Sequence, residues 1–404
     1  MSTESSSSTS TDDTPSSIID NHEENEDENE EETDTKTSIK VELLFFLFGT
    51  NVLFAYNTFI NGIDYFQKIF PNESSVSQNI ARVYNIAASC SYFISTPFIE
   101  NFSVKLRYYV STTIVAICML FFTIYANLPN PNYTAVLVVE GVTSVFAGFL
   151  FGTTMGYAGL FGGNCATLAS TGLAMSGVLT SIFRLISKAM GRGEGWFYFG
   201  ISFVIIVCSL ICFAFFQNTT IAKAKYSNTV ISTNFCQRMS RITHIFKKMW
   251  IFAFEAFLCM TITLTLFPGY ATQTKSKHGL TSDWVSTIVT SLYMVGDFIG
   301  RLLPRWICFP SPKFLFIPHL VRLIFFPAYI ISIEGAALED DIWIYVVTFL
   351  LALTNGYFLT LCISYTAKLE TLQENEVELA SFCVSLGLNI GIFVGSWLTY
   401  TLPQ

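Results

Sequence analysis

The sequence predicts an all-α polytopic membrane protein, and three observations lead to this fold class. Hydrophobic residues make up 51% of the 404 residues and charged residues only 13%, whereas soluble domains hold about 25% charged residues. Long apolar windows recur along the chain, each of a length that crosses a bilayer as a helix. No alternating pattern typical of strands competes with these windows. We therefore expect a bundle of membrane-spanning helices.

Eleven apolar windows are expected to be membrane-spanning helices, in a six-plus-five arrangement. They cover residues 41–65, 80–99, 106–127, 134–158, 166–190, 196–217, 248–268, 284–308, 314–333, 342–366 and 378–401. The chain then divides into an acidic cytosolic tail at 1–40, a six-helix bundle at 41–217, a cytosolic loop at 218–247 and a five-helix bundle at 248–404.

The acidic tail differs in composition from the rest of the chain. Residues 1–40 hold thirteen Asp or Glu residues and two Lys residues, many Ser and Thr residues, and hardly any apolar side chains. This composition cannot bury a core, so the tail is expected to be disordered. It also lacks the basic start and the short apolar run of a signal peptide.

The distribution of Lys and Arg predicts the orientation of the bundle. With the tail in the cytosol, about thirteen Lys and Arg residues fall on the cytosolic side and about five on the outer side, in line with the positive-inside rule. The N-terminus is then cytosolic and the C-terminus lies outside, in a multi-pass protein expected in the plasma membrane. The outer hairpin with Lys188 and Arg192 goes against the rule.

The sequence holds none of the common patterns for cofactor, metal or nucleotide chemistry. The ten Cys residues form no CxxC pair, and the four His residues are scattered. No phosphate-binding loop of the G-x-x-x-x-G-K-[ST] type and no nucleophile elbow occur. We therefore predict no cofactor, no metal site, no enzymatic activity and no nucleic-acid partner.

Glycine residues recur at spacings of four in three of the predicted spans. The fourth span holds Gly148, Gly152 and Gly156, the last span holds Gly387, Gly391 and Gly395, and the eighth holds Gly296 and Gly300. Small residues at this spacing let another helix approach closely in a membrane. The pattern predicts close helix pairs, which either are static or let helices slide during function.

Two opposite charges lie inside the eighth predicted span, in "GDFIGRLLP". Asp297 and Arg301 are four residues apart and so share one helix face. A lone charge in the middle of a membrane costs about 2.5–3.5 kcal/mol on insertion scales, and pairing reduces that cost. The pair is expected to face the bundle interior, either as the polar wall of a solute path or as a bridge that only holds helices together. Thr290 and Met294 fall near the same face.

Several stretches resemble helices of the equilibrative nucleoside transporters, in order along residues 41–401. "LYMVGDFIGRLLP" is similar to the eighth helix of that family, with its D-x-x-x-R signature. Gly49, Leu53, Tyr56 and Asn57 match the G-x-x-x-L-x-x-[WY]-N pattern of the first helix. "STGLAMSGVLTSIFRLISKA" is similar to the fifth helix and "SFCVSLGLNIGIFVGSWL" to the last. Together these motifs identify the chain as resembling that family, and a protist member in particular.

The resemblance implies a bundle like the major facilitator fold, which carries nucleosides or nucleobases by alternating access. Asp297 and Arg301 would contact the sugar or brace that contact, and apolar residues of the first and last helices would line the base pocket. The substrate-binding residues implied in this way are Asp297, Arg301, Thr290, Met294, Leu53, Tyr56, Asn57, Ile60, Phe151 and Leu388.

Two of these positions depart from the family pattern. Phe151 stands where many members have a Gln that bonds the base, and Met294 replaces a polar residue. Both changes remove hydrogen-bonding groups. The resemblance therefore implies either an altered base selectivity or a contact supplied by another residue, such as Asn57.

The expected function is passive transport of nucleosides, and of nucleobases as a further cargo. The alternative is a permease of the same fold for nucleobases alone or for another small solute, with or without proton coupling. A channel, a receptor or a purely structural protein fits less well, since no pore-loop signature is visible. Glu140 is an extra acid inside a span, expected near the outer membrane surface or in a structural pair. The expected partners are the cargo and the lipid bilayer.

Overall fold

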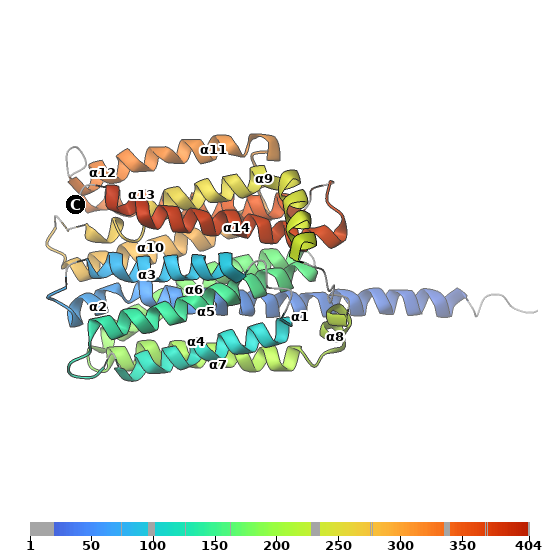
Figure 1. Ribbon diagram of the computed structural model, residues 1–404, viewed down its shortest axis with the longest axis horizontal. Helices are drawn as coiled ribbons and strands as arrows, with labels where there is room; N and C mark the ends of the chain where they lie inside the picture. Colours follow the sequence, from blue (N-terminus) through green and yellow to red (C-terminus); the bar gives the residue numbers. More distant parts are fainter. Residues whose placement is uncertain are drawn as a thin grey trace, which may run out of the picture.

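The computed structural model describes residues 20–402, apart from residues 96–101, 228–234 and 335–339 and the single positions 74, 126, 162, 275, 277, 368 and 370. The described residues form helices that run side by side through one bundle (Figure 1). They contain no strand. The predicted all-α fold is therefore confirmed.

The N-terminal half of the bundle contains seven helices, which pack mainly as the pairs α1–α6, α3–α5 and α4–α7. Their bounds are α1 (Asp20–Asn61), α2 (Ile63–Ile69), α3 (Val76–Ser95), α4 (Val104–Tyr125), α5 (Tyr133–Leu160), α6 (Gly163–Met190) and α7 (Glu194–Phe216). The short helix α8 (Thr220–Ser227) follows at the edge of the bundle (Figure 1).

The C-terminal half packs mainly through the pairs α9–α14 and α10–α13. Its helices are α9 (Phe235–Leu266), α10 (Ser282–Leu302), α11 (Phe316–Val321), α12 (Phe325–Glu334), α13 (Asp341–Ala367) and α14 (Glu374–Leu398). Short 3-10 turns join them: η2 (Ala271–Gln273), η3 (Leu303–Arg305), η4 (Pro312–Phe314), η5 (Arg322–Ile324) and η6 (Thr399–Thr401). The two halves meet where α6 packs on α10 and where α3 and α5 pack on α14.

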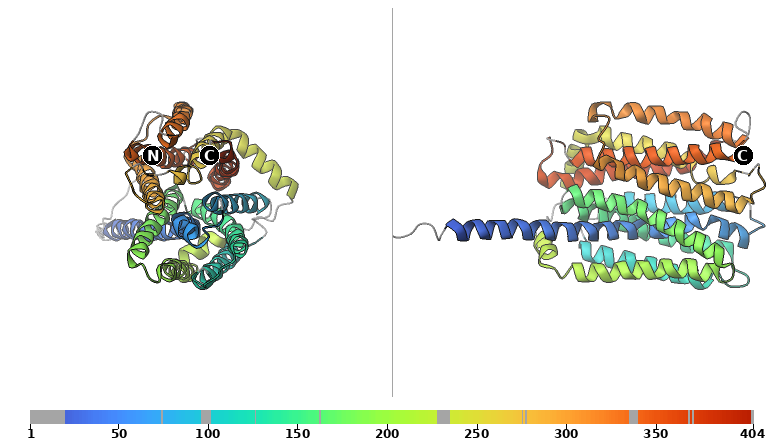
Figure 2. Two further views of the ribbon diagram at one scale, coloured as in Figure 1. Left: turned by 90° about the vertical axis from the view of Figure 1, so that its left-hand side faces the viewer. Right: turned by 180° about the vertical axis from the view of Figure 1, so that it is seen from behind.

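Two segments that were predicted to be non-helical contain helices, the acidic tail and the loop at 218–247. Helix α1 begins at Asp20, so it takes in much of the segment expected to be disordered, and it projects from one end of the bundle (Figures 1 and 2). Glu has a good helix propensity, and extending a formed helix avoids the cost of nucleation. Residues 1–19 of the predicted tail lie outside the described residues. The predicted loop at 218–247 contains α8 and the start of α9.

Nine helical stretches in the described part of the chain are long and apolar enough to cross a membrane. The predicted spans at 80–99 and 284–308 are not among them, so the count of eleven stays a prediction. The corresponding helices, α3 and α10, lie within the bundle beside the others (Figure 1). Both carry charged and amide side chains, Arg82 and Asn85 in α3 and Asp297 and Arg301 in α10, which lower their apolar content.

The two ends of the bundle differ in what they carry. Helix α2 and the C-terminus lie at one end, whereas the projecting part of α1 and helix α8 lie at the other (Figure 1). We call the first of these the α2 end. Large apolar side chains such as Ile117, Phe215, Trp250 and Ile324 are exposed along the outside of the bundle, as expected for a surface that faces lipid tails.

The predicted close helix pairs occur where the glycines lie. A Cβ atom on Gly387 would overlap the Ala253 carbonyl oxygen of α9, and one on Gly391 would overlap the Phe257 carbonyl oxygen one turn further along. Gly395 repeats the contact at Thr261, at 2.8 Å from its carbonyl oxygen. The small-residue pattern of the last span is therefore confirmed as the surface on which α9 and α14 pack.

The α10–α13 pair is equally close and carries the Asp297–Arg301 segment. A Cβ atom on Gly300 would overlap the Leu353 carbonyl oxygen of α13, and a Cβ atom on Gly356 would overlap the Asp297 carbonyl oxygen of α10. Each helix thus lacks a side chain where the other's backbone passes. This contact sets the position of α10, and so of its charged pair, against α13.

Substituting Gly356 by Ala is expected to destabilise the fold by about 1–3 kcal/mol, the usual cost of overpacking a tight site. The control is Gly141→Ala, because the nearest atom to a Cβ there is a methyl carbon of Val83 at 3.7 Å. Thermal unfolding of the purified protein in detergent measures the difference. Equal melting temperatures for Gly356→Ala and Gly141→Ala would show that the α10–α13 contact is looser than described.

Candidate functional site

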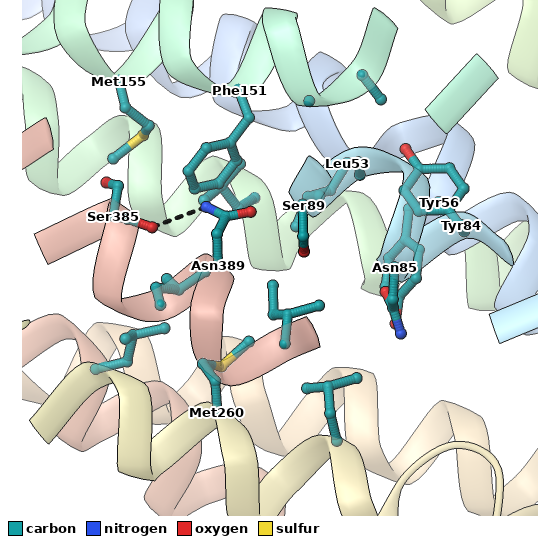
Figure 3. Close-up of a pocket in the computed structure, with 18 of the residues that line it drawn as sticks. Leu53, Tyr56, Tyr84, Asn85, Ser89, Phe151, Met155, Met260, Ser385 and Asn389 are labelled. Carbon is teal, nitrogen blue, oxygen red and sulfur yellow. Dashed lines mark hydrogen bonds between the residues drawn. The ribbon is translucent and has the colours of Figure 1, made fainter. Parts of the chain in front are cut away.

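A cavity lies between the two halves of the bundle (Figure 3). Its walls come from α1, α3, α5 and α6 on one side and from α9, α10, α13 and α14 on the other. The lining residues are Leu53, Tyr56, Tyr84, Asn85, Ala88, Ser89, Ala147, Gly148, Phe151, Met155, Leu173, Met260, Leu264, Arg301, Leu359, Ile363, Ser385, Leu388, Asn389 and Ile392. A solute held here would contact both halves at once.

Most of the cavity wall is aliphatic or aromatic, and four predicted site residues belong to this part of the wall. Leu53 and Tyr56 come from α1, Phe151 from α5 and Leu388 from α14. The rings of Tyr56 and Tyr84 lie 4.8 Å apart between centroids. The Asn389 amide donates to the Ser385 carbonyl oxygen at 2.8 Å (Figure 3). Such walls suit a flat, apolar ring with hydrogen-bonding groups at its edges.

Arg301 provides the charged part of the wall, and Asp297 lies behind it. The Arg301 Nε donates to Asp297 Oδ2 at 2.9 Å, and Nη1 donates to Ser170 Oγ of α6 at 2.9 Å. The second oxygen of Asp297 accepts a hydrogen bond from the Asn355 amide of α13 at 2.7 Å. The predicted i, i+4 pair therefore exists, but only Arg301 lines the cavity. Arg301 also bridges the two halves through Ser170.

The other predicted residues of α1 and α10 lie away from the cavity wall. The Asn57 amide donates to Ser176 Oγ of α6 at 2.6 Å, and Ile60 packs in an apolar cluster with residues of α9 and α10. Met294 lies against Gly177 of α6. Thr290 is buried, and its hydroxyl has no hydrogen-bond partner among the described residues.

Position around and along α1 accounts for this division. Asn57 lies about 100° around the helix from Tyr56 and contacts α6, so it does not supply the base contact that the sequence left open for it. Ile60 lies on the same face as Leu53, but about 10 Å further along the helix axis, beyond the cavity wall. Sequence similarity alone does not resolve differences of this size.

Polar residues of α3 and α14 line the cavity and were not predicted from the sequence. They are Tyr84, Asn85 and Ser89 on one side and Ser385 and Asn389 on the other (Figure 3). The Ser89 hydroxyl is buried and without a hydrogen-bond partner among the described residues. The signal was present in the sequence, because Asn85 and Ser89 lie four residues apart in a membrane helix, where polar groups mark interior faces.

A second set of charged residues lies at the α2 end of the bundle. We call it the interhalf ionic cluster, and within the N-terminal half it joins α2, α6 and α7. Arg184 is 2% exposed and donates from Nε and Nη2 to the two oxygens of Asp64 at 2.8 and 2.7 Å. It also reaches Glu194 Oε2 at 3.3 Å.

Lys188 carries the interhalf ionic cluster across to the C-terminal half. Its Nζ lies 3.0 Å from Asp64 Oδ2 and 3.0 Å from Asp283 Oδ2 of α10, and it donates to Thr287 Oγ1 of α10 at 3.1 Å. Lys188, one of the two outer residues that go against the positive-inside rule, therefore contacts two carboxylates.

Glu140 of α5 is not in the structural pair that was one of the two environments expected for it. Its side chain is fully buried inside the bundle, and neither carboxyl oxygen has a hydrogen-bond partner among the described residues. The other expectation, a place near the outer membrane surface, stays a prediction.

No metal site is formed by the residues that the structure describes, since they contain no cluster of three or more His, Cys, Asp or Glu side chains placed to hold an ion. The polar groups around the cavity are instead hydroxyls, amides and one guanidinium. These groups bind neutral polar or anionic solutes through hydrogen bonds.

Comparisons with known proteins agree with this architecture. A family model described as "Nucleoside transporter" matches residues 220–403. Equilibrative nucleotide transporter 8 of Arabidopsis thaliana is 24% identical over 379 residues, which cover 88% of this chain and 94% of that protein. Equilibrative nucleotide transporter 1 of the same plant is 25% identical over 397 residues, covering 89% of this chain and 85% of that protein.

Solved transporters show the same fold at low identity. The major facilitator proton:xylose symporter XylE aligns with a TM-score of 0.59 at 11% identity, over 91% of this chain and 88% of that chain. A POT family transporter in complex with a conjugated peptide aligns with a TM-score of 0.62 at 9% identity, over 90% of each chain. The expected major facilitator architecture is confirmed. The chain is thus similar to the nucleoside transporter family model over its C-terminal half and to the equilibrative nucleotide transporters over most of its length.

Proposed function

We propose that the chain carries nucleosides across a membrane by alternating access, as a passive transporter. The observation that carries the proposal is the cavity between the halves, which combines aromatic and aliphatic walls with the Arg301 guanidinium. A nucleoside has an apolar base that stacks on such walls and a sugar whose hydroxyls both donate and accept. Arg301 supplies donors to these hydroxyls, and the Asp297 carboxylate behind it holds the guanidinium in place.

Alternating access is supported by the way the two halves contact each other. The interhalf ionic cluster joins them at the α2 end through Lys188, Asp283 and Thr287. Breaking these contacts would let the halves part there and open the cavity to that side. Arg301, which bridges the halves through Ser170, is placed to sense cargo and to change the contact between the halves.

The membrane and the orientation belong to the same proposal. We place the chain in the plasma membrane with its N-terminus in the cytosol and its C-terminus outside, so that the α2 end is the outer end. The alternative cargo, a nucleobase or another small solute in the same fold, would use the apolar walls without the sugar contact. Because the relatives are named nucleotide transporters, the uptake experiments should also compare a nucleotide with the nucleosides.

Substituting Arg301 by Ala is expected to reduce nucleoside uptake roughly ten- to a hundredfold, the loss expected when a hydrogen bond to a charged group is removed. Uptake of radiolabelled adenosine, inosine and uridine into proteoliposomes measures it, with hypoxanthine as the cargo without a sugar. Hypoxanthine uptake should fall less. Arg301→Lys should also fail in large part, because an ammonium does not reproduce the planar fork of the guanidinium.

The exchanged double variant, Asp297→Arg with Arg301→Asp, separates a cargo site from a structural bridge. A bridge depends only on the presence of both charges, so the exchange would restore folding and uptake together. A sugar site depends on whether the carboxylate or the guanidinium stands at each of the two positions, so nucleoside uptake by the exchanged protein should stay low. Full nucleoside uptake by the exchanged protein would overturn the role of the pair in binding.

Loss of the interhalf ionic cluster is expected to open the α2 end more often. Lys188→Met removes the contacts to Asp283 and Thr287, so a cysteine placed at Asn85 should react faster with a membrane-impermeant thiol reagent. The control is Lys68→Met, which removes the ion pair between the exposed Lys68 and Glu194, a contact within the N-terminal half that does not join the halves. Equal labelling rates in the Lys188→Met and Lys68→Met backgrounds would show that the cluster does not hold the α2 end closed.

Proton-coupled transport is the second candidate mechanism, and the environment of Glu140 favours it. A carboxylate without a partner is costly to bury in its ionised form, so Glu140 would bind and release a proton as its surroundings open and close. Passive transport predicts no accumulation of nucleoside above the outside concentration when an inward proton gradient is imposed. Accumulation that is lost in Glu140→Gln, and kept in the control Glu255→Gln, would establish proton coupling instead.

A further inference from the structure

Arg322 is a buried charge on the helical segment that otherwise contacts the bundle least. It is the first residue of η5, in the span between Pro312 and Ile333. Its neighbours Val321 and Ile324 expose about two thirds of their surface, at 62% and 64%, whereas Arg322 is 2% exposed. Only this side chain of the turn enters the bundle. An arginine kept inside a membrane helix marks a functional contact by default.

The Arg322 guanidinium contacts two helices and no carboxylate among the described residues. Nη2 donates to Thr263 Oγ1 of α9 at 2.7 Å and to the Leu351 carbonyl of α13 at 3.3 Å. Nη1 donates to the carbonyl oxygen of Cys259 at 3.2 Å and to its sulfur. If Arg322 only anchored the outer segment, any buried acceptor would serve. Its acceptor Thr263 instead makes a further hydrogen bond toward the cavity.

A chain of three hydrogen bonds connects Arg322 with Asp297. Beyond the bond from Arg322 to Thr263, the Thr263 hydroxyl lies 2.8 Å from Asn355 Oδ1 and donates to it, and the Asn355 amide donates to Asp297 Oδ1 at 2.7 Å. Asp297 Oδ2 then accepts from Arg301. The chain thus runs from an outer segment, through α9 and α13, to the charged wall of the cavity.

The chemistry at the two ends sets the direction of the outer bonds of this chain. A guanidinium only donates, so Thr263 Oγ1 accepts from Arg322, and a carboxylate only accepts, so the Asn355 NH₂ group donates to Asp297. The oxygen of Asn355 is then the acceptor that faces the Thr263 hydroxyl. The single proton of that hydroxyl has two acceptors, Asn355 Oδ1 at 2.8 Å and the Cys259 carbonyl at 2.9 Å, and Arg322 Nη1 competes for the Cys259 carbonyl by donating to it.

The network also holds more positive than negative charge. Asp297 is its one carboxylate, against the guanidinium groups of Arg301 and Arg322. When Arg301 turns from Asp297 toward a cargo hydroxyl, the carboxylate still has Asn355 as a donor and Arg322 as the next cation. An uncompensated carboxylate in this interior would be costly.

We propose that Arg322 is a positioning residue for the cargo site: through Thr263 and Asn355 it orients the Asp297 carboxylate and keeps it compensated while Arg301 engages the sugar. The inference rests on the proposed function, because it assumes that Asp297 and Arg301 act on the cargo. Its test therefore separates a failure of the chain of hydrogen bonds from a failure of the cargo site itself.

The experiment breaks the chain in its middle, where folding is least at risk. Thr263→Val removes the hydroxyl and leaves Arg322, Asn355 and Asp297 in place. Adenosine uptake into proteoliposomes should show a KM raised about tenfold, the effect of losing one hydrogen bond that acts on a charged group, with a smaller change in maximal rate. Adenine uptake should stay near its original value. Thr263→Ser keeps the hydroxyl and should restore the original KM.

Matched controls and a double variant decide the outcome. Tyr329→Phe removes a buried hydrogen bond of 2.9 Å to Thr348 between α12 and α13 without touching the chain, and it should leave both uptakes unchanged. Thr263→Val should add little to Asp297→Asn, because both variants interrupt one pathway. If the Arg322→Gln protein folds, it should show the same rise in the KM for adenosine as Thr263→Val. If it does not fold, Thr263→Val alone tests the proposal.

Two results would count against different statements. If Asp297→Asn leaves adenosine uptake intact, the cargo site itself is wrong, whatever Thr263→Val does. If Asp297→Asn abolishes adenosine uptake but Thr263→Val leaves the KM unchanged, or lowers adenosine and adenine uptake alike, the cargo site stands and the positioning role of Arg322 is overturned.

Discussion

The cost of holding a carboxylate and guanidinium groups inside a membrane bundle is the constraint on which the rest of this structure depends. Asp297 and Arg301 tolerate burial because each hydrogen bonds to a further partner, Asn355 for one and Ser170 for the other. Those partners lie on α13 and α6, so the pair ties α10 to both halves. The glycines at 300 and 356 let α10 and α13 approach closely enough for this arrangement.

The same constraint explains how polarity is distributed over the bundle. Helices on the periphery expose large apolar side chains, whereas α3 and α10, which are too polar to be recognised as spans by length and composition, carry groups that face the cavity or the interface between the halves. Polar groups are stable there because other helices shield them from lipid. The cavity and the interhalf ionic cluster are the two places where this interior polarity is concentrated.

A substantial part of the fold was predictable because its signals are local. Apolar windows predicted most of the helices, and glycines four residues apart predicted that α10 and α14 pack closely against other helices, though not that these are α13 and α9. The i, i+4 spacing of Asp297 and Arg301 predicted their pairing. For the site, similarity pointed to α1, α5, α10 and α14, but neither to the other helices of the cavity nor to the positions that line it. Leu53 and Tyr56 line it, while Asn57 and Ile60, on the same helix, do not.

By itself the sequence determined the class of molecule, the succession of helices and the charged pair at the site, because hydrophobic length and helical spacing are properties of neighbouring residues. Only the tertiary structure decided which charges compensate each other. Lys188 meets Asp64 across 124 residues, and Arg322 is joined to Asp297 through Thr263 and Asn355, residues of two other helices. Such pairings follow from the angles at which helices pack, and no local pattern records those angles.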